Sequence, residues 1–186
     1  MKINATIQID SARLFLVDNC FNSTTLAAVN VVFSDLNNGW AADPIFAHRP
    51  GRLVYQNSNT VTQSIDASAQ VLSDQIGALL GRKIQYKSSS LWIDLPGYVI
   101  APHYDIPGNP EIAMQIFVGN RAKVWEMLGT AIYLPEQHGR NPLFEMHYRI
   151  NSGYIMEYPD RVRHGLNHNI PAQYERNSVY LRFASA

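Results

Sequence analysis

The sequence has little cysteine and no long apolar run. Cys20 is the only cysteine among the 186 residues, so an internal disulfide is excluded and a reducing compartment is favoured. No apolar stretch approaches the roughly 20 residues that a membrane-spanning helix needs. Residues 1–10 alternate apolar and polar side chains, whereas a secretion signal needs an apolar core. We therefore expect a cytoplasmic protein with no membrane partner.

The sequence also lacks an excess of charge of either sign. Fifteen Lys and Arg residues balance fifteen Asp and Glu residues, and no run of basic residues is present. A nucleic acid partner is therefore not expected, because phosphate binding would lack its usual electrostatic driving force. The hydrophobic fraction of 46% is typical of a globular protein, and a chain of this length normally forms one domain.

The first half of the chain contains two helix patterns. Residues 11–21 have the pattern of a short strand, and a helix capped by Ser23 or Thr24 is expected to run to about Leu36. Residues 37–63 are rich in Asn, Pro and Gly and are expected to form a loop with short extended pieces.

The second helix pattern is the clearer one. Asp66 is expected to cap this helix and Gly81 to end it. Its apolar positions have helical spacing, and they are Val71, Leu72, Ile76, Leu79 and Leu80.

After Gly81 the pattern becomes one of short strands separated by turn-forming residues. The expected strands are 83–95, 98–105, 112–118, 128–134, 143–150, 153–158, 161–166 and 177–184. Strands of this number and spacing favour a sandwich or barrel. We therefore expect a mostly β fold, a double-stranded β-helix (jelly roll). Residues 1–82 would supply an N-terminal strand and buttressing helices, and residues 83–186 the core of the same single domain.

A candidate metal site lies in this β region. His103 and Asp105 are two residues apart, so in an extended strand they share a face while Tyr104 points the other way. Two imidazoles and one carboxylate form the facial triad of non-haem iron enzymes, and this pair supplies two of the three ligands. Taken alone, the pair is weak evidence for a metal site, because the pattern His-x-Asp is common by chance. The alternative is a histidine and a solvated aspartate at the surface.

The third ligand is expected to be His164. It ends a short strand-like segment and is followed by Gly165. His168 is the competing candidate, but its neighbours Asn167, Asn169 and Pro171 favour a turn. A strand holds a ligand more rigidly than a turn does.

The last strand pattern places a candidate anion-binding residue on one face. Arg176, Ser178, Tyr180 and Arg182 alternate along it. If this face points into the barrel, Arg176 needs an anionic partner, which a dicarboxylate cosubstrate would supply while Ser178 adds a hydroxyl. If the face points outward, Arg176 is an ordinary surface cation.

Three motifs in order resemble the 2-oxoglutarate/Fe(II)-dependent dioxygenases, and the prolyl-4-hydroxylase-like branch is nearest. The motifs are Pro-His-Tyr-Asp at 102–105, Arg-His-Gly-Leu at 163–166 and Arg-Asn-Ser-Val-Tyr-Leu-Arg-Phe at 176–183. The resemblance implies that His103, Asp105 and His164 bind Fe(II). It also implies that Arg176 and Ser178 hold the distal carboxylate of 2-oxoglutarate.

The same resemblance implies a hydroxylase that uses O₂ on an unknown prime substrate, either a prolyl or other peptide side chain or a small molecule. Three features depart from the family pattern. Gly129 stands where many relatives have two glycines, the spacing from His164 to Arg176 is long at twelve residues, and no tyrosine is evident as a 2-oxoglutarate contact.

Two other functions remain open. The same triad could bind Zn²⁺ and activate water for hydrolysis, which a nearby Glu or His general base would favour. A non-enzymatic jelly-roll binding protein is the second alternative. Among the remaining polar residues, Asp94 could be a second acid near the site, but a turn residue before Pro96 is the role we expect. His138 is expected in a solvated loop rather than a lid. Trp92 is expected to be a packing residue.

Overall fold

The computed structural model describes residues 1–43, 51–106, 110–119, 126–134 and 141–186. Within them, the protein is a jelly roll with two helices, and the predicted fold class is confirmed. No helix in the described part of the chain is long and apolar enough to cross a membrane.

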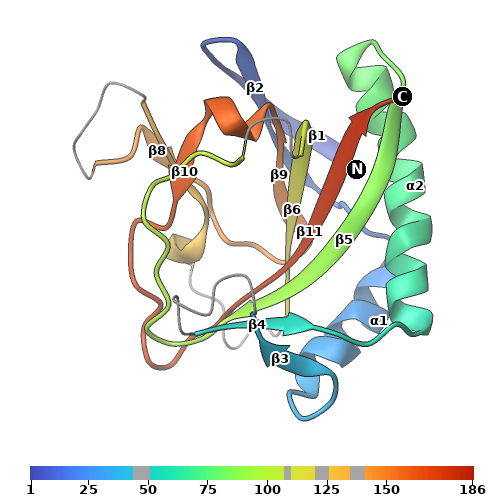
Figure 1. The fold of residues 1–186 in the computed structure, drawn as a ribbon, viewed down its shortest axis with the longest axis vertical. Helices are drawn as coiled ribbons and strands as arrows, with labels where there is room; N and C mark the ends of the chain where they lie inside the picture. Colours follow the sequence, from blue (N-terminus) through green and yellow to red (C-terminus); the bar gives the residue numbers. More distant parts are fainter. Residues whose placement is uncertain (44–50, 107–109, 120–125, 135–140) are drawn as a thin grey trace.

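A large antiparallel sheet of eight strands forms one wall of the jelly roll (Figure 1). In spatial order its strands are β1 (Lys2–Ile9), β2 (Ala12–Asp18), β9 (Ser152–Glu157), β6 (Ile112–Val118), β11 (Arg176–Ser185), β5 (Ile84–Asp94), β4 (Arg52–Tyr55) and β3 (Trp40–Ala42). Residues 1–82 therefore supply β1 to β4 of this sheet as well as both helices. The boundary placed at residue 82 stays a prediction.

A small antiparallel sheet of three short strands forms the opposite wall. Its order is β10 (Arg163–Gly165), β7 (Ala131–Tyr133) and β8 (Phe144–Glu145). Two short 3-10 helices, Glu126–Leu128 and Pro159–Arg161, precede β7 and β10.

The two helices pack on the outer face of the large sheet, away from the small sheet (Figure 1). Helix α1 (Ser23–Ser34) and helix α2 (Thr60–Leu80) bury residues such as Val29 and Ile76 against the sheet. Each fully buried side chain of this size contributes about 1.5–3 kcal/mol. A second apolar cluster fills the space between the two sheets, and it includes Leu14, Phe117, Ile132 and Met156.

Both helices begin at asparagine caps that differ from the predicted ones. The side chain of Asn22 accepts the Thr25 N–H at 2.8 Å, so Ser23 and Thr24 lie within the helix, which ends before Leu36.

In α2, Asn59 forms a capping box with Thr62, and Asp66 lies inside the helix. Asparagine is among the best N-caps because its short side chain reaches the free N–H groups of the first turn. Gly81 ends α2 in the left-handed conformation with φ 70°, as predicted.

Six of the eight predicted strands are confirmed by β5, β6, β7, β9, β10 and β11, whereas the other two are wrong over most of their length. Residues 98–105 form no regular strand. They pair with residues 164–170 through separate hydrogen bonds, including Leu166 N–H to Ile100 C=O at 3.0 Å. Pro102 has no N–H to add to this ladder. Of residues 143–150 only Phe144–Glu145 is a strand.

Candidate metal centre and its pocket

Three side chains that can bind a metal converge at the edge of the small sheet. The ligand atoms of His103, Asp105 and His164 all lie within 4.8 Å of one another. The Nε2 atoms of His103 and His164 lie 3.7 and 3.6 Å from the same Asp105 Oδ1. The structure thus brings together the two residues predicted from local spacing and the one predicted from a distant segment.

Backbone pairing sets the distance between the two histidines. His103 and His164 exchange two N–H···O=C hydrogen bonds, both 2.9 Å long. Gly165 permits this close approach, because a Cβ there would lie 2.8 Å from the Ile100 carbonyl oxygen. The interpretation that His103 and Asp105 share a face holds although their segment is not a regular strand. Tyr104 between them is 42% exposed.

Backbone carbonyls fix the tautomer of both imidazoles. The Nδ1 of His103 lies 3.0 Å from the Ala101 oxygen, and the Nδ1 of His164 lies 2.8 Å from the Val162 oxygen. A carbonyl oxygen can only accept, so each Nδ1 carries the proton and each Nε2 keeps its lone pair for a metal.

A tyrosine holds the carboxylate. The hydroxyl of Tyr180 donates to Asp105 Oδ2 at 3.2 Å, which leaves Oδ1 facing the two imidazoles. Burial, and then the charge of Asp105, raise the pKa of Tyr180 well above its ordinary value, so the phenol stays protonated and remains a donor.

The cluster lines a cavity of about 680 Å³ between the two sheets. Its apolar wall includes Trp92, Ile100, Ile106 and Leu166, and its polar wall includes three arginines: Arg52, Arg176 and Arg182. Asp105 is the only carboxylate among the described residues that line it. Trp92, predicted to be a packing residue, stacks on Tyr180 at 4.6 Å and also faces the cavity.

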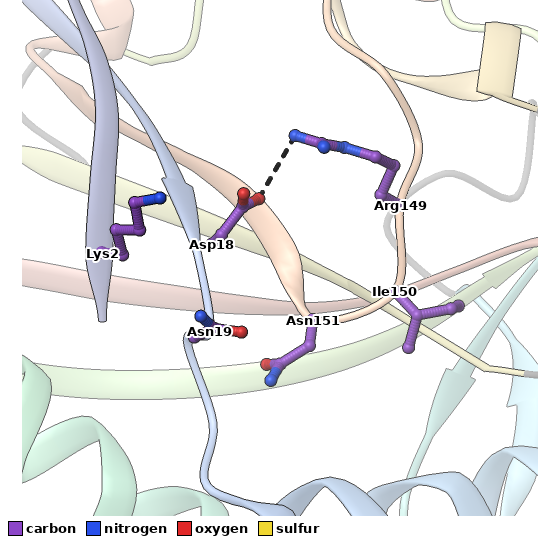
Figure 2. Close-up of a pocket in the computed structure, with 6 residues that line it drawn as sticks. All are labelled: Lys2, Asp18, Asn19, Arg149, Ile150 and Asn151. Carbon is purple, nitrogen blue, oxygen red and sulfur yellow. Dashed lines mark hydrogen bonds and ion pairs between the residues drawn. The ribbon is translucent and has the colours of Figure 1, made fainter.

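A second, smaller cavity of about 220 Å³ lies among Lys2, Asp18, Asn19, Arg149, Ile150 and Asn151 (Figure 2). Asp18 and Arg149 form an ion pair of 3.4 Å across it. None of the described groups that could hold a metal includes a residue of this cavity. The chemistry is therefore assigned to the larger cavity.

Arg176 is buried in the wall of the larger cavity and points inward, as the strand pattern allowed. It is 3% exposed. Its Nη2 donates to Gln115 Oε1 at 3.0 Å and to Thr130 Oγ1 at 2.9 Å, while its Nε donates to the Leu128 carbonyl. The anionic partner that a buried Arg176 was expected to need is supplied within the protein, because its Nη1 lies 2.9 Å from Asp94 Oδ2. The expected contact with a dicarboxylate cosubstrate stays a prediction.

Asp94 is shared between two arginines. Arg52 donates to Oδ1 at 2.5 Å and to Oδ2 at 3.1 Å, and Arg176 donates to Oδ2 as well. The prediction of a turn role is wrong, since Asp94 ends β5 and is 0% exposed. One carboxylate is thus shared by two guanidinium groups, and the buried carboxylate of Asp43 also acts electrostatically on Arg52.

Ser178 lies behind this wall. It is fully buried and accepts a hydrogen bond from Gln115 Nε2 at 2.9 Å. This bond turns the Gln115 carbonyl oxygen toward Arg176 and toward Tyr154, whose hydroxyl donates to it at 2.9 Å. Burial raises the pKa of Tyr154 to about 12, so this hydroxyl also stays protonated.

Several residues of the pocket were not predicted from the sequence. Gln115, Thr130, Tyr154 and Arg52 line the cavity but lie outside the three motifs at 102–105, 163–166 and 176–183. His168 lies outside the metal cluster, with its Nε2 3.8 Å from Glu145. His138 falls within 135–140, outside the described residues.

Comparison with known proteins gives structural neighbours only. No family model and no curated protein matches the sequence. A prolyl hydroxylase from Trichoplax adhaerens, in complex with a hypoxia inducible factor peptide fragment, aligns with a TM-score of 0.67 and 12% identity over 92% of this chain and 83% of its own. A prolyl-4-hydroxylase from Pseudomonas putida aligns with a TM-score of 0.64 and 12% identity over 93% of this chain and 92% of its own. The fold is that of the 2-oxoglutarate/Fe(II) oxygenases.

Members of this fold group differ in what they bind. HygX from Streptomyces hygroscopicus, with nickel, 2-oxoglutarate and hygromycin B bound, aligns with a TM-score of 0.62 and 11% identity over 93% of this chain and 83% of its own. The same fold therefore accommodates both a peptide and hygromycin B, and the fold of this chain does not select between such ligands.

Proposed function

We propose that this protein is an Fe(II)- and 2-oxoglutarate-dependent oxygenase that hydroxylates an organic substrate. The observation that carries the proposal is the geometry of the donor set. Two imidazoles with protonated Nδ1 atoms present free Nε2 atoms to one carboxylate oxygen, on the wall of a cavity. Two neutral imidazoles and one carboxylate suit Fe(II) and leave coordination positions open.

In this proposal His103, Asp105 and His164 are the iron ligands. When bound, iron and 2-oxoglutarate supply the oxidising chemistry: 2-oxoglutarate and O₂ are converted to succinate and CO₂ as one oxygen atom enters a C–H bond of the substrate. The carbonyls of Ala101 and Val162 hold the imidazole tautomers, and Tyr180 orients Asp105.

Arg176 is assigned to the distal carboxylate of 2-oxoglutarate. Its support is the position of this buried guanidinium in the cavity wall, where Arg176 and Arg52 share one carboxylate, Asp94. Thr130 offers a hydroxyl at the same place. Ser178 acts through Gln115, whose amide it orients, and Tyr154 is the tyrosine of this subsite.

Hydrolysis on the same triad has less support. A metal-dependent hydrolase uses a general base beside the bound water. Among the described residues that line the cavity, the only carboxylate and the only histidines are the three candidate ligands themselves. A non-enzymatic role would be favoured by the loss of a ligand, and all three are in place. A cytoplasmic location stays a prediction.

The test is succinate formation from 2-oxoglutarate under air with added Fe(II), with and without a panel of candidate substrates. We expect iron-dependent succinate that rises with a true substrate. His164→Ala should abolish it, whereas His168→Ala is the matched control and should retain it. Zinc-dependent hydrolytic activity without succinate would refute the proposal, as would a His168→Ala variant that alone loses activity.

A further inference from the structure

A second guanidinium group lies at the other end of the cavity from the proposed 2-oxoglutarate subsite. Arg182 lies on the same face of β11 as Arg176, six residues further along the strand. At about 3.3 Å per residue their Cα atoms are roughly 20 Å apart. Tyr180 lies between them on this face, so the two arginines serve different parts of the cavity.

Arg182 carries a charge that its surroundings do not neutralise. Its Nη1 lies 3.2 Å from Ser88 Oγ and 3.5 Å from Ser90 Oγ. No ion pair joins it to a carboxylate in the described ranges, whereas Arg52 and Arg176 share Asp94. A half-buried arginine that faces a cavity, and whose described partners are hydroxyls and an aromatic ring, is suited to bind an anion that comes from solution.

The position of Arg182 relative to the metal cluster indicates which molecule that anion belongs to. Its Cζ lies 5.2 Å from the centroid of the Tyr180 ring, and the hydroxyl of that ring lies 3.2 Å from Asp105 Oδ2. An anion bound to Arg182 would therefore be separated from the metal ligands by about the length of the Tyr180 side chain. A 2-oxoglutarate held between Arg176 and the metal extends away from this point.

The same part of the cavity has an apolar rim. Tyr104 and Ile106, which flank Asp105 in the sequence, line the cavity and are 42% and 73% exposed, and Pro110 lines it as well. Exposed apolar side chains at a cavity mouth favour a ligand with apolar surface of its own.

We propose that the prime substrate is a small carboxylic acid with an apolar portion. Its carboxylate binds the guanidinium of Arg182 and the hydroxyl of Ser88, and its apolar portion contacts Ile106 and Tyr104. This places a C–H bond near the carboxylate beside the metal cluster. The inference rests on the proposed function, because it takes the metal and 2-oxoglutarate as occupying the rest of the cavity.

Binding can be tested without turnover. Protein loaded with Zn(II) and saturating 2-oxoglutarate is titrated with N-acetyl amino acids that have apolar side chains. Each is supplied as the free acid, the primary amide and the corresponding phosphonate, and binding is followed by ligand-observed NMR. We expect the free acid to bind about tenfold or more tightly than its amide, since a charge-assisted pair to arginine is lost in the amide.

Three variants test whether Arg182 is the source of the preference for the free acid over the amide. Arg182→Gln should remove it, and Arg182→Lys should retain part of it, because lysine keeps the charge without the planar fork. Arg149→Gln, which removes a guanidinium from the smaller cavity in Figure 2, is the matched control and should retain it fully.

Equal binding of acid and amide would overturn the inference, as would an acid preference that survives in Arg182→Gln. Tighter binding of the phosphonate than of the acid would overturn the carboxylate assignment. Binding of 2-oxoglutarate itself is measured on the same samples. Its absence from the wild-type protein would overturn the proposed function, and its presence without an acid preference would overturn only this inference.

Discussion

The two sheets of the jelly roll hold their parts of the site in different ways. On the large sheet, Arg52, Asp94 and Arg176 are buried and joined by ion pairs between strands. On the small sheet and the segment facing it, the two histidines are held by backbone carbonyls within two residues of each ring. The proposed anion subsite is thus part of the core, and the proposed metal centre is a local arrangement at its edge.

This difference predicts separate consequences for substitutions in the two regions. A change in the buried ion-pair group should lower the free energy of unfolding as well as ligand binding, because it leaves a buried charge without compensation. A change at the metal ligands should lower metal binding and leave the stability of the metal-free protein nearly unchanged.

The largest effect is expected for Asp94→Asn. The substitution removes the carboxylate that two buried guanidinium groups share, which should lower the free energy of unfolding by about 3–5 kcal/mol. Urea denaturation of the metal-free protein measures it. The matched control is Asp18→Asn, which breaks the largely exposed pair with Arg149 and should cost less than about 1 kcal/mol. Equal stability of the two variants would contradict the comparison.

The next largest effect is expected for Arg176→Ala. Loss of a buried charge-assisted contact should weaken 2-oxoglutarate binding by about 2–5 kcal/mol while Fe(II) affinity is largely retained. Calorimetric titration of the Zn(II)-loaded protein with 2-oxoglutarate measures this. If Arg182→Ala weakens 2-oxoglutarate binding and Arg176→Ala does not, the two arginines have been assigned to the wrong ends of the cavity.

The smallest effect is expected for Tyr180→Phe, which removes the donor to Asp105. Loss of an outer partner of a metal ligand should lower Fe(II) affinity about tenfold, which an anaerobic metal titration measures. A variant with wild-type iron affinity would show that the Tyr180 hydroxyl does not orient the carboxylate.

The same variant should change the alkaline limit of stability. Burial and Asp105 raise the pKa of Tyr180 in the folded protein, so at high pH the unfolded chain loses this proton first. Stability is therefore fully present below the ordinary tyrosine pKa of about 10 and is lost as pH rises toward the folded-state pKa. Tyr180→Phe should lose less stability than the wild-type protein above that pH.

The contrast between the sheets also explains what the sequence could predict. Strands β5, β6 and β11 were predictable because they are long and rich in β-branched and aromatic residues. Residues 98–105 were not, because their pairing consists of separate bonds around Pro102. The pair His103 and Asp105 was predictable because its geometry is local to three residues.

Apart from Arg176 and Ser178, the wall of the proposed anion subsite could not be predicted, because it is assembled by contacts between distant segments. Asp94 meets Arg52 across 42 residues and Arg176 across 82. Thr130 meets Arg176 across 46. No local pattern marks an aspartate at the end of a strand as a shared ion-pair partner, so the turn residue was the natural interpretation.

The most direct test of the central claim is an anaerobic titration of the metal-free protein with Fe(II) in the presence of 2-oxoglutarate. Chelation of iron by the 2-oxo acid gives a visible charge-transfer absorption, which should saturate at one equivalent of iron per chain. It should be lost in Asp105→Ala, whose iron affinity should fall more than about 100-fold. No absorption in the wild-type protein, or an unchanged titration in Asp105→Ala, would contradict the account.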